Sequence, residues 1–318
     1  MTSAWRIFIV VSLTAAALLW AARHWYDTAL ARHLEQGKAY AAKRLELTGT
    51  LPAVLAESSG LVVSRAQPGV LWTHNDSGDG PNLYAIDATG RLLATFTVAG
   101  AAAVDWEEMS SGPCVADLAS SADAPLCLYL ADIGDNDRRR QSLTVYMVVE
   151  PSLTAGSRTI ASRSFRYRYP DGPENAEALA VLPNGDVTII SKGGSGRIGF
   201  FRLRGEAIAR ATVSSELLSA EYVGDSGIRP DAAIGRLVTG AAVSPDATTL
   251  AVRTYYEVFF FDAVKDHEAV AWRDSGKRCF LGEAESQGEA IAYLDRDTLL
   301  LTSERGRDAA GRIHRLQC

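Results

Sequence analysis

A phrase of polar residues leading into an apolar strand recurs five times along the chain, and this repetition limits the possible fold more than any other feature. Each copy is followed by a turn and a second strand that ends in another polar cluster. The five copies begin at Glu57, Asp105, Asn175, Val238 and Gln287. A repeat of roughly 45 to 70 residues built only from strands is typical of a β-propeller. We therefore predict an all-β fold with a single propeller.

The spacing of the repeats predicts five blades, with six as the alternative. The last blade lacks an outer strand before the chain ends, whereas residues 43–50 alternate between polar and apolar as a strand does. We predict that this segment pairs with residues 312–316, because a ring closed by both chain ends leaves no open sheet edge. The final strand of blade three is expected within residues 210–223.

An apolar run from Ile7 to Ala22 lies near the N-terminus. Its length is short for a membrane span and long for the apolar core of a cleavable signal peptide. Cleavage after Ala22 would put Trp20 where a small residue is needed, so an uncleaved signal anchor is favoured. The predicted domains are a signal anchor or signal peptide at 1–24, a helical stalk at 25–42 and the propeller at 43–318.

The evidence on location conflicts. More basic residues follow the apolar run than precede it, which favours a cytoplasmic C-terminal domain. The four cysteines form no CxxC pair, so they favour disulfides over zinc, and disulfides need an oxidising compartment. We predict bridges between Cys114 and Cys127, around a loop-like insertion, and between Cys279 and Cys318. The expected location is the bacterial inner membrane, crossed once, with the propeller in the periplasm or outside the cell.

The polar clusters predict one functional site. In a propeller the innermost strand begins, and the second strand ends, on the same face of the disc, so both sets of clusters should meet around the mouth of the central tunnel. The candidate metal ligands are Asp76, Asp105, Glu107, Asp132, Asp135 and Glu304. The candidate catalytic residues are Glu177, Glu289, Lys192, Arg253 and His74. The candidate substrate-binding residues are Asn75, Tyr255, Asn136 and Trp106.

Carboxylate and amide oxygens suit Ca²⁺ or another divalent cation. The alternative is structural, because Asp, Asn and Ser at strand ends also cap turns and join blades. Other chemistry is poorly supported, since the sequence has neither a GxSxG nor an HExxH motif. The formal net charge of −6, with no basic stripe, argues against nucleic acid as a partner.

The phrases at residues 72–78, 105–107, 131–136, 177–179 and 253–255 resemble those of a group of bacterial extracytoplasmic β-propeller proteins whose activities are uncharacterised. This resemblance covers residues 55–304 and implies a propeller without implying an activity. More loosely, the chain is similar to calcium-dependent propeller hydrolases of the phytase-like, esterase-like and gluconolactonase-like kinds. Those proteins hold a metal at the tunnel mouth among Glu, Asn and Asp. No motif here matches them residue for residue, so their catalytic roles are not transferred.

Two functions follow from this reasoning. The first is a binding or assembly module, tethered to the membrane by its N-terminal segment, whose tunnel mouth holds a protein or glycan. The alternative is a divalent-metal-dependent hydrolase of phosphate or carboxylic esters or lactones. In that case Glu177 or Glu289 would be the general base, and Lys192 and Arg253 would bind an anionic group. A strongly perturbed carboxylate pKa would favour the enzyme, and a mouth neutralised by ion pairs would favour the binding module.

Overall fold

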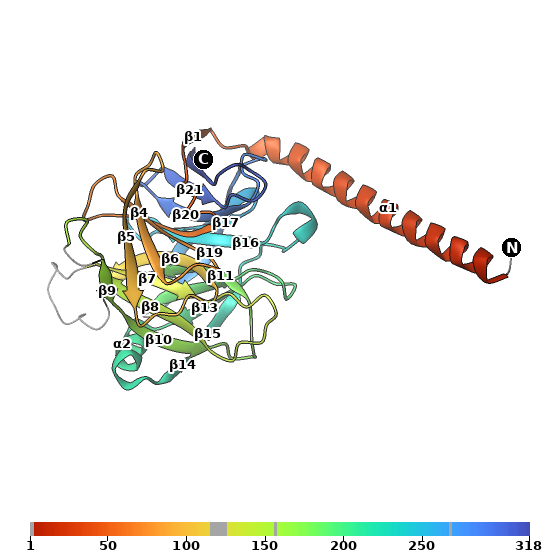
Figure 1. Cartoon of the computed structure of the whole chain (residues 1–318). Coiled ribbons are helices and arrows are strands. Elements are labelled where there is room, and N and C mark those ends of the chain that lie inside the picture. Colours follow the sequence, from red (N-terminus) through yellow and green to blue (C-terminus); the bar gives the residue numbers. More distant parts are fainter. Residues whose placement is uncertain (1–2, 115–125, 156–157, 267–268) are drawn as a thin grey trace.

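The computed structural model of the chain describes residues 3–114, 126–155, 158–266 and 269–318, with backbone only for residues 3–14, 265, 266 and 269. In the described part of the chain, one long helix projects from a ring of β-sheets (Figure 1). Most of the predicted insertion between the first two cysteines, residues 115–125, lies outside the described residues.

Within the described residues the strands form five sheets, arranged as the blades of one propeller, which confirms the predicted fold. Blade one contains β2 (Ser58–Val63), β3 (Leu71–Asn75), β4 (Asn82–Ile86), β5 (Leu92–Ala99) and β9 (Thr159–Ala161). Blade two contains β6 (Trp106–Pro113), β7 (Leu126–Asp132), β8 (Leu143–Val149), β10 (Arg163–Arg168) and β14 (Leu217–Ser219). Blade three contains β11 (Ala176–Val181), β12 (Val187–Ser191), β13 (Gly199–Leu203) and β15 (Glu221–Asp225).

Blade four contains β16 (Val238–Val243), β17 (Thr249–Thr254), β18 (Glu257–Asp266) and β19 (Ala269–Phe280). Blade five contains β20 (Gly288–Tyr293), β21 (Leu299–Ser303), β22 (Arg312–Gln317) and β1 (Arg44–Thr50). Strand β1 pairs antiparallel with β22, from Arg44 opposite Gln317 to Thr50 opposite Arg312. The N-terminal strand therefore closes the ring, as predicted, because the strands nearest the two ends of the chain pair with each other.

Apolar side chains of neighbouring blades pack between the sheets. Trp72 of blade one and Leu128 of blade two lie in one such core, and Ile189 of blade three packs with Tyr129 of blade two in the next. The inner strands are covered on both faces, so β11 is buried along its whole length. Burial on both faces explains why these strands read as continuous apolar runs after their polar first residues.

Blade three differs from the prediction. The strand expected within residues 210–223 begins only at Glu221, because Gly205–Ser214 forms the helix α2. This segment places Ile208 and Ala211 three residues apart, on the helix face that packs into the core between blades two and three. Ser215, in a left-handed conformation with φ of 60°, ends the helix. The spacing of apolar residues is helical here, and the sequence reasoning overlooked it.

The N-terminal helix α1 (Ser3–Gly37) continues through the predicted boundary at residue 24 and leads into a short 3-10 helix, Lys38–Tyr40. Its last turns pack on blade four. His33 and Tyr40 approach the buried carboxylate of Glu257, with His33 Nε2 3.6 Å and Tyr40 Oη 2.9 Å from its oxygens. The ring of Phe280 packs against both His33 and Tyr40.

Two observations bear on the predicted membrane anchor. The part of the chain that the structure describes contains no helix long and apolar enough to cross a membrane. About half of the predicted run from Ile7 to Ala22 lies where the side chains are not described.

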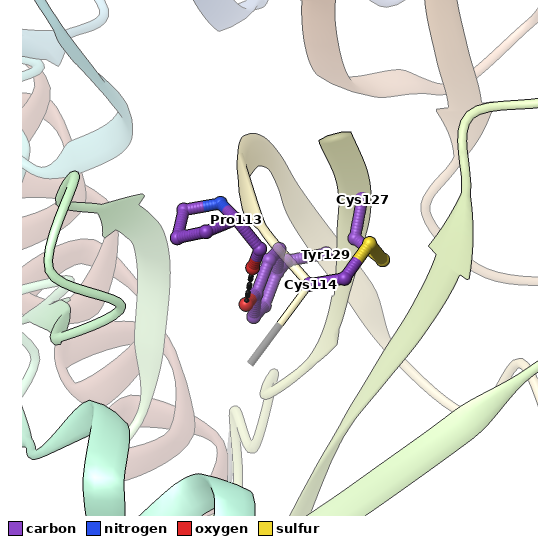
Figure 2. Close-up of a disulfide and its surroundings, with 4 residues drawn as sticks. All are labelled: Pro113, Cys114, Cys127 and Tyr129. Carbon is purple, nitrogen blue, oxygen red and sulfur yellow. Dashed lines mark hydrogen bonds between the residues drawn. A yellow bond between two sulfur atoms is a disulfide. The ribbon is translucent and has the colours of Figure 1, made fainter. Parts of the chain in front are cut away.

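Both predicted disulfides are present. The bridge from Cys114 to Cys127, with a Cα–Cα distance of 5.0 Å, joins the ends of β6 and β7 beside Tyr129, which donates its hydroxyl hydrogen to Pro113 O (Figure 2). The bridge from Cys279 to Cys318, with a Cα–Cα distance of 5.6 Å, ties the outer strand of blade four to the C-terminus beside blade five. Disulfides persist in oxidising compartments, so this pattern indicates an extracellular or periplasmic domain.

Candidate functional site at the tunnel mouth

Each of the five inner strands carries a β-bulge at the repeated phrase. The pairing register shifts around Glu107 in β6, Glu177 in β11, Thr239 in β16 and Glu289 in β20, and between Ser58 and Leu61 in β2. A bulge inserts an extra residue into the strand and redirects its side chain. The five-fold repeat in the sequence is therefore a five-fold bulge in the structure, and in three blades the redirected residue is a glutamate.

Backbone hydrogen bonds join the blades at this level. Trp106 N donates to Asp76 O at 3.1 Å, which connects the start of blade two to the second-strand exit of blade one. Val238 N donates to Lys192 O at 3.0 Å between blades four and three. Strand starts and second-strand exits of adjacent blades thus lie side by side, at the end of the tunnel that we call the tunnel mouth. The polar residues of the mouth are Asp76, Asp105, Glu107, Glu177, Lys192, Tyr255, Glu289 and Glu304.

Three carboxylates form the tightest group in the tunnel mouth. One carboxylate oxygen each from Asp76, Asp105 and Glu107 lies within 4.8 Å of the others. Glu107 is only 3% exposed, and no described group donates a hydrogen bond to its carboxylate. Asp76 Oδ1 is likewise buried without a hydrogen-bond partner among the described residues. Because buried carboxylate oxygens are normally hydrogen-bonded or paired with a cation, this carboxylate triad has the character of an oxygen-donor site for a metal ion.

Beside the carboxylate triad, the tunnel mouth surrounds an ammonium group. Lys192 Nζ lies 2.7 Å from Glu177 Oε1, which also accepts a 3.2 Å hydrogen bond from Asn175. The charges of Glu289 and Glu304 act on each other and on Lys192. Among the described residues of the mouth, Lys192 is the one basic side chain, and six carboxyl groups surround it. The tunnel mouth is therefore strongly acidic.

This crowding perturbs the titration of the carboxyl groups. Burial, followed by the nearby Asp105 carboxylate, raises the pKa of Asp76 to about 8. Burial and the charge of Glu177 hold the pKa values of Glu107 and Glu289 well above the usual range. Burial and the charge of Glu57 raise the pKa of Glu304 to about 7. Several acids of the mouth therefore retain protons near neutral pH unless a cation is bound.

Four of the predicted residues hold the loops around the mouth. Asp132 forms an ion pair with Arg140 at 2.8 Å, although burial still raises the pKa of its carboxyl group. Asp135 accepts hydrogen bonds from the backbone amides of Arg139 and Arg140, at 2.9 and 2.8 Å. Asn136 accepts one from the Asn175 amide at 3.1 Å. These contacts are those of the structural alternative raised by the sequence.

Asn75 belongs to the same class of loop contacts. Its amide oxygen accepts the Glu57 N–H at 3.0 Å, and its amide nitrogen donates to Val54 O and Asp79 Oδ2 at 2.9 and 3.0 Å. Its side chain is thereby committed to holding the segment that precedes β2.

His74, Trp106 and Arg253 lie in the core below the mouth. His74 Nδ1 is 3.0 Å from Asn75 O, its ring meets Trp106 edge-on, and burial lowers its pKa to about 4. Trp106 donates its Nε1–H to Ala102 O at 3.0 Å. The Arg253 guanidinium is fully buried between blades four and five, where it contacts Glu285. All three side chains are inaccessible to a ligand in the mouth.

Sequence reasoning overlooked Glu108. This fully buried carboxylate accepts hydrogen bonds from Met109 N at 2.9 Å and from Ala241 N, across the tunnel in blade four, at 2.8 Å. Burial raises its pKa well above the usual range. A second acid directly after Glu107 was the available signal, since the bulge places both side chains near the tunnel axis.

The fold and the site together define the class of this chain: a five-bladed β-propeller with an acidic, carboxylate-lined tunnel mouth. No family model matches the chain, and no curated protein resembles it in sequence. Solved structures with a similar fold include the PQQ-bound aldose sugar dehydrogenase of Streptomyces coelicolor, with 15% identity, a TM-score of 0.42 and coverage of 87% of this chain and 99% of that one.

Two further structures have similar folds. A luciferin-regenerating enzyme has 9% identity and a TM-score of 0.44, and the likeness covers 86% of this chain and 95% of that one. The β-propeller domain of Cps50 (Swd1) from Myceliophteria thermophila has 11% identity and a TM-score of 0.42, covering 86% of this chain and 100% of that one. At these identities and TM-scores, the likenesses say nothing about what this chain binds or catalyses.

Proposed function

We propose that the tunnel mouth binds a divalent cation, with Ca²⁺ the first candidate, and that the propeller is a cation-dependent hydrolase of phosphate or carboxylic esters, lactones included. The observation that carries the proposal is the carboxylate triad, in which one oxygen of each residue lies within 4.8 Å of the others and Asp76 Oδ1 is buried without a hydrogen-bond partner among the described residues. Hard carboxylate oxygens in this number suit Ca²⁺, Mg²⁺ or Mn²⁺ rather than zinc or copper.

The remaining residues of the mouth have chemistry that suits hydrolysis. A cation bound by the triad would stabilise a developing oxyanion and favour ionisation of water. Glu304, with a pKa of about 7, suits a general base, which works best when its pKa lies near the operating pH. Burial and the charge of Glu177 raise the pKa of Glu289, which favours the protonated form that can donate a hydrogen bond. Lys192, whose ammonium is held by Glu177, would orient an anionic group of the substrate.

A second candidate is a binding module that uses the same cation site to hold a protein or glycan. It is favoured by the positions of His74 and Arg253, two of the five side chains expected to be catalytic, which are engaged in the core. The triad serves both candidates. They differ in turnover, because a binding module would retain an ester substrate without cleaving it.

The cation is tested first by metal analysis and thermal melting of the purified protein, with chelator and then with added Ca²⁺, Mg²⁺ or Mn²⁺. A cation at 100 times its Kd stabilises a protein by about 2.7 kcal/mol. At about 2 °C per kcal/mol, the melting temperature should rise by about 5 °C. Asp105→Asn should abolish this rise. Asp137→Asn, which removes an acid with a 72% exposed side chain outside the triad, should leave it intact. If none of the three cations raises the melting temperature of the wild-type protein, the cation site is refuted.

Turnover is tested with chromogenic phosphate and carboxylic esters and a lactone on the cation-loaded protein. The hydrolase predicts cation-dependent cleavage that Glu304→Gln reduces without weakening cation binding. Binding of a glycan or protein without cleavage of any ester would instead support the module.

We infer further that the propeller lies in the periplasm or outside the cell of a bacterium and is tethered to the inner membrane by α1. Leu18, Leu19 and Trp20 of this helix are at least 70% exposed, and Trp25 is 65% exposed, which suits contact with lipid. Carbonate extraction of membranes provides the test. Release of the intact chain into the soluble fraction would contradict the tether.

A further inference from the structure

A basic cleft lies between blades three and four, away from the carboxylate triad. It is a cavity of about 450 Å³, bounded by the chain that follows β15 and by the outer strands β18 and β19. Its charged lining residues are Arg229, Arg236, Lys277, Arg278 and Asp274. Four of the five are basic, in a chain whose formal net charge is −6. The basic cleft therefore opposes the overall charge of the molecule and the acidity of the tunnel mouth.

Two of the four cations are held in place. Arg236 contacts the buried Glu257 carboxylate through Nε at 2.8 Å and Nη2 at 3.4 Å. Arg278 Nη1 lies 3.9 Å from the same carboxylate, and its guanidinium stacks 3.9 Å above the ring centroid of Tyr40. One carboxylate is thus shared by two guanidinium groups, which leaves positive charge in excess and keeps both side chains ordered.

One further cation is available to a ligand. Arg229 is exposed and has no acidic partner among the described residues. Lys277 also borders the cleft, but its ammonium lies 4.7 Å from the centroid of the Phe260 ring, which packs between blades four and five, so its charge is directed to the other face of the blade. Asp274, the acid of the lining, accepts a 2.8 Å hydrogen bond from Gly276 N in the turn of β19. The cleft therefore offers one free arginine beside two preorganised ones.

We propose that the basic cleft binds a phosphate group. Guanidinium forks match phosphate oxygens in pairs, and three arginines line this cleft. The cavity has room for more than a bare anion, so it can also admit part of a larger molecule that carries the phosphate. The inference stands on residues outside the tunnel mouth and does not depend on the proposed hydrolase.

The position of the cleft indicates two sources for such a phosphate. Glu257, which holds Arg236 and Arg278, also contacts His33 at the end of α1, so the cleft lies at the base of the N-terminal helix. A soluble phosphorylated compound and a phospholipid headgroup carry the same chemistry. The soluble compound would reach the cleft from the solvent, and the headgroup would reach it if α1 is embedded in a membrane.

Calorimetric titration of the full-length protein in detergent tests the proposal. The probes are inorganic phosphate, glycerol 3-phosphate and short-chain phosphatidic acid below its micelle concentration, with short-chain phosphatidylcholine as the zwitterionic reference. The variant Arg229→Ala should weaken phosphate binding by about tenfold or more. The matched control Arg65→Ala removes one exposed arginine elsewhere and should leave the affinity unchanged.

Preferential binding of phosphatidic acid would identify a lipid headgroup as the ligand, and preferential binding of the soluble phosphates would identify a soluble compound. Three results would overturn the proposal: no saturable binding of any phosphate probe, an equal loss of affinity in the control variant, or equal affinity for phosphatidylcholine. Melting curves of both variants establish that the fold is intact, as expected for exposed side chains.

Discussion

Arg253 supports a prediction that separates a structural role from ligand binding. Its guanidinium is completely buried and donates hydrogen bonds to Ala290 O at 2.7 Å and Thr302 O at 2.9 Å, both in blade five. It also pairs with Glu285, whose second oxygen lies 2.7 Å from His314 Nδ1. Although burial opposes ionisation, the charge of Arg253 lowers the pKa of Glu285, so the pair is ionic. Arg253 therefore joins blades four and five.

The magnitude follows from what remains after truncation. Arg253→Met leaves the Glu285 charge buried without its partner, and breaking a buried pair in this way costs about 3–5 kcal/mol. Two carbonyls also lose a donor, which places the expected loss in the upper part of that range. At about 2 °C per kcal/mol, the melting temperature should fall by about 8–10 °C.

Urea denaturation followed by circular dichroism measures the loss. The control Arg65→Met, at an exposed arginine, should change the free energy of unfolding by about 0.5 kcal/mol or less. The double variant Arg253→Met/Glu285→Met removes both charges and should recover much of the stability lost in the single variant.

A loss below about 1 kcal/mol for Arg253→Met would refute this reasoning, because removing one partner of a buried ion pair costs about 3–5 kcal/mol. Lower affinity for an anionic ligand at undiminished stability would instead restore the role in substrate binding that the sequence suggested for Arg253.

Two other predictions concern pH and the disulfides. The pKa of Glu304 rises from 4.5 to about 7 on folding, so the native state binds the extra proton, and its contribution to stability is complete below pH 4.5 and lost as the pH rises through 7. In chelator, Glu304→Gln should therefore flatten the fall in stability between pH 4.5 and 7, as read from melting temperatures; an unchanged profile would contradict the raised pKa. The bridge from Cys279 to Cys318 spans 39 residues, so replacing both cysteines by serine should cost about 3–4 kcal/mol in urea denaturation, and a loss under about 1 kcal/mol would contradict its role in tying blade four to the chain end.

Much of the fold is readable from local patterns. The five polar phrases, each followed by paired apolar strands, predict the blades, and the missing last strand predicts closure by the N-terminus. The helix α2 was missed because a short helix of ten residues competes with strand patterns on either side of it. The parallel outer strands β9 and β14 were also missed, since three residues without a turn partner leave no periodic signal.

For the candidate site, the position of the carboxylates is predictable from the sequence, whereas their ion pairs and hydrogen bonds are not. The sequence by itself determined that carboxylates would gather at the tunnel mouth, because strand direction in a blade decides which ends meet, and residue order determines strand direction. It did not determine which of them would be neutralised. Asp132 meets Arg140 from its own loop, whereas Glu107 meets no donor at all among the described residues.

Only the tertiary structure decided the depth of each side chain and its partner from another blade. Arg253 and Tyr255 lie two residues apart, yet Arg253 points into the core and Tyr255 belongs to the mouth, where burial and the charge of Glu289 raise its pKa. Glu285 reaches Arg253 from 32 residues away, and His314 reaches Glu285 from 29 residues away. Local sequence carries strand period and turn chemistry, but the pairing of buried charges depends on contacts between distant segments, and these exist only once the ring has closed.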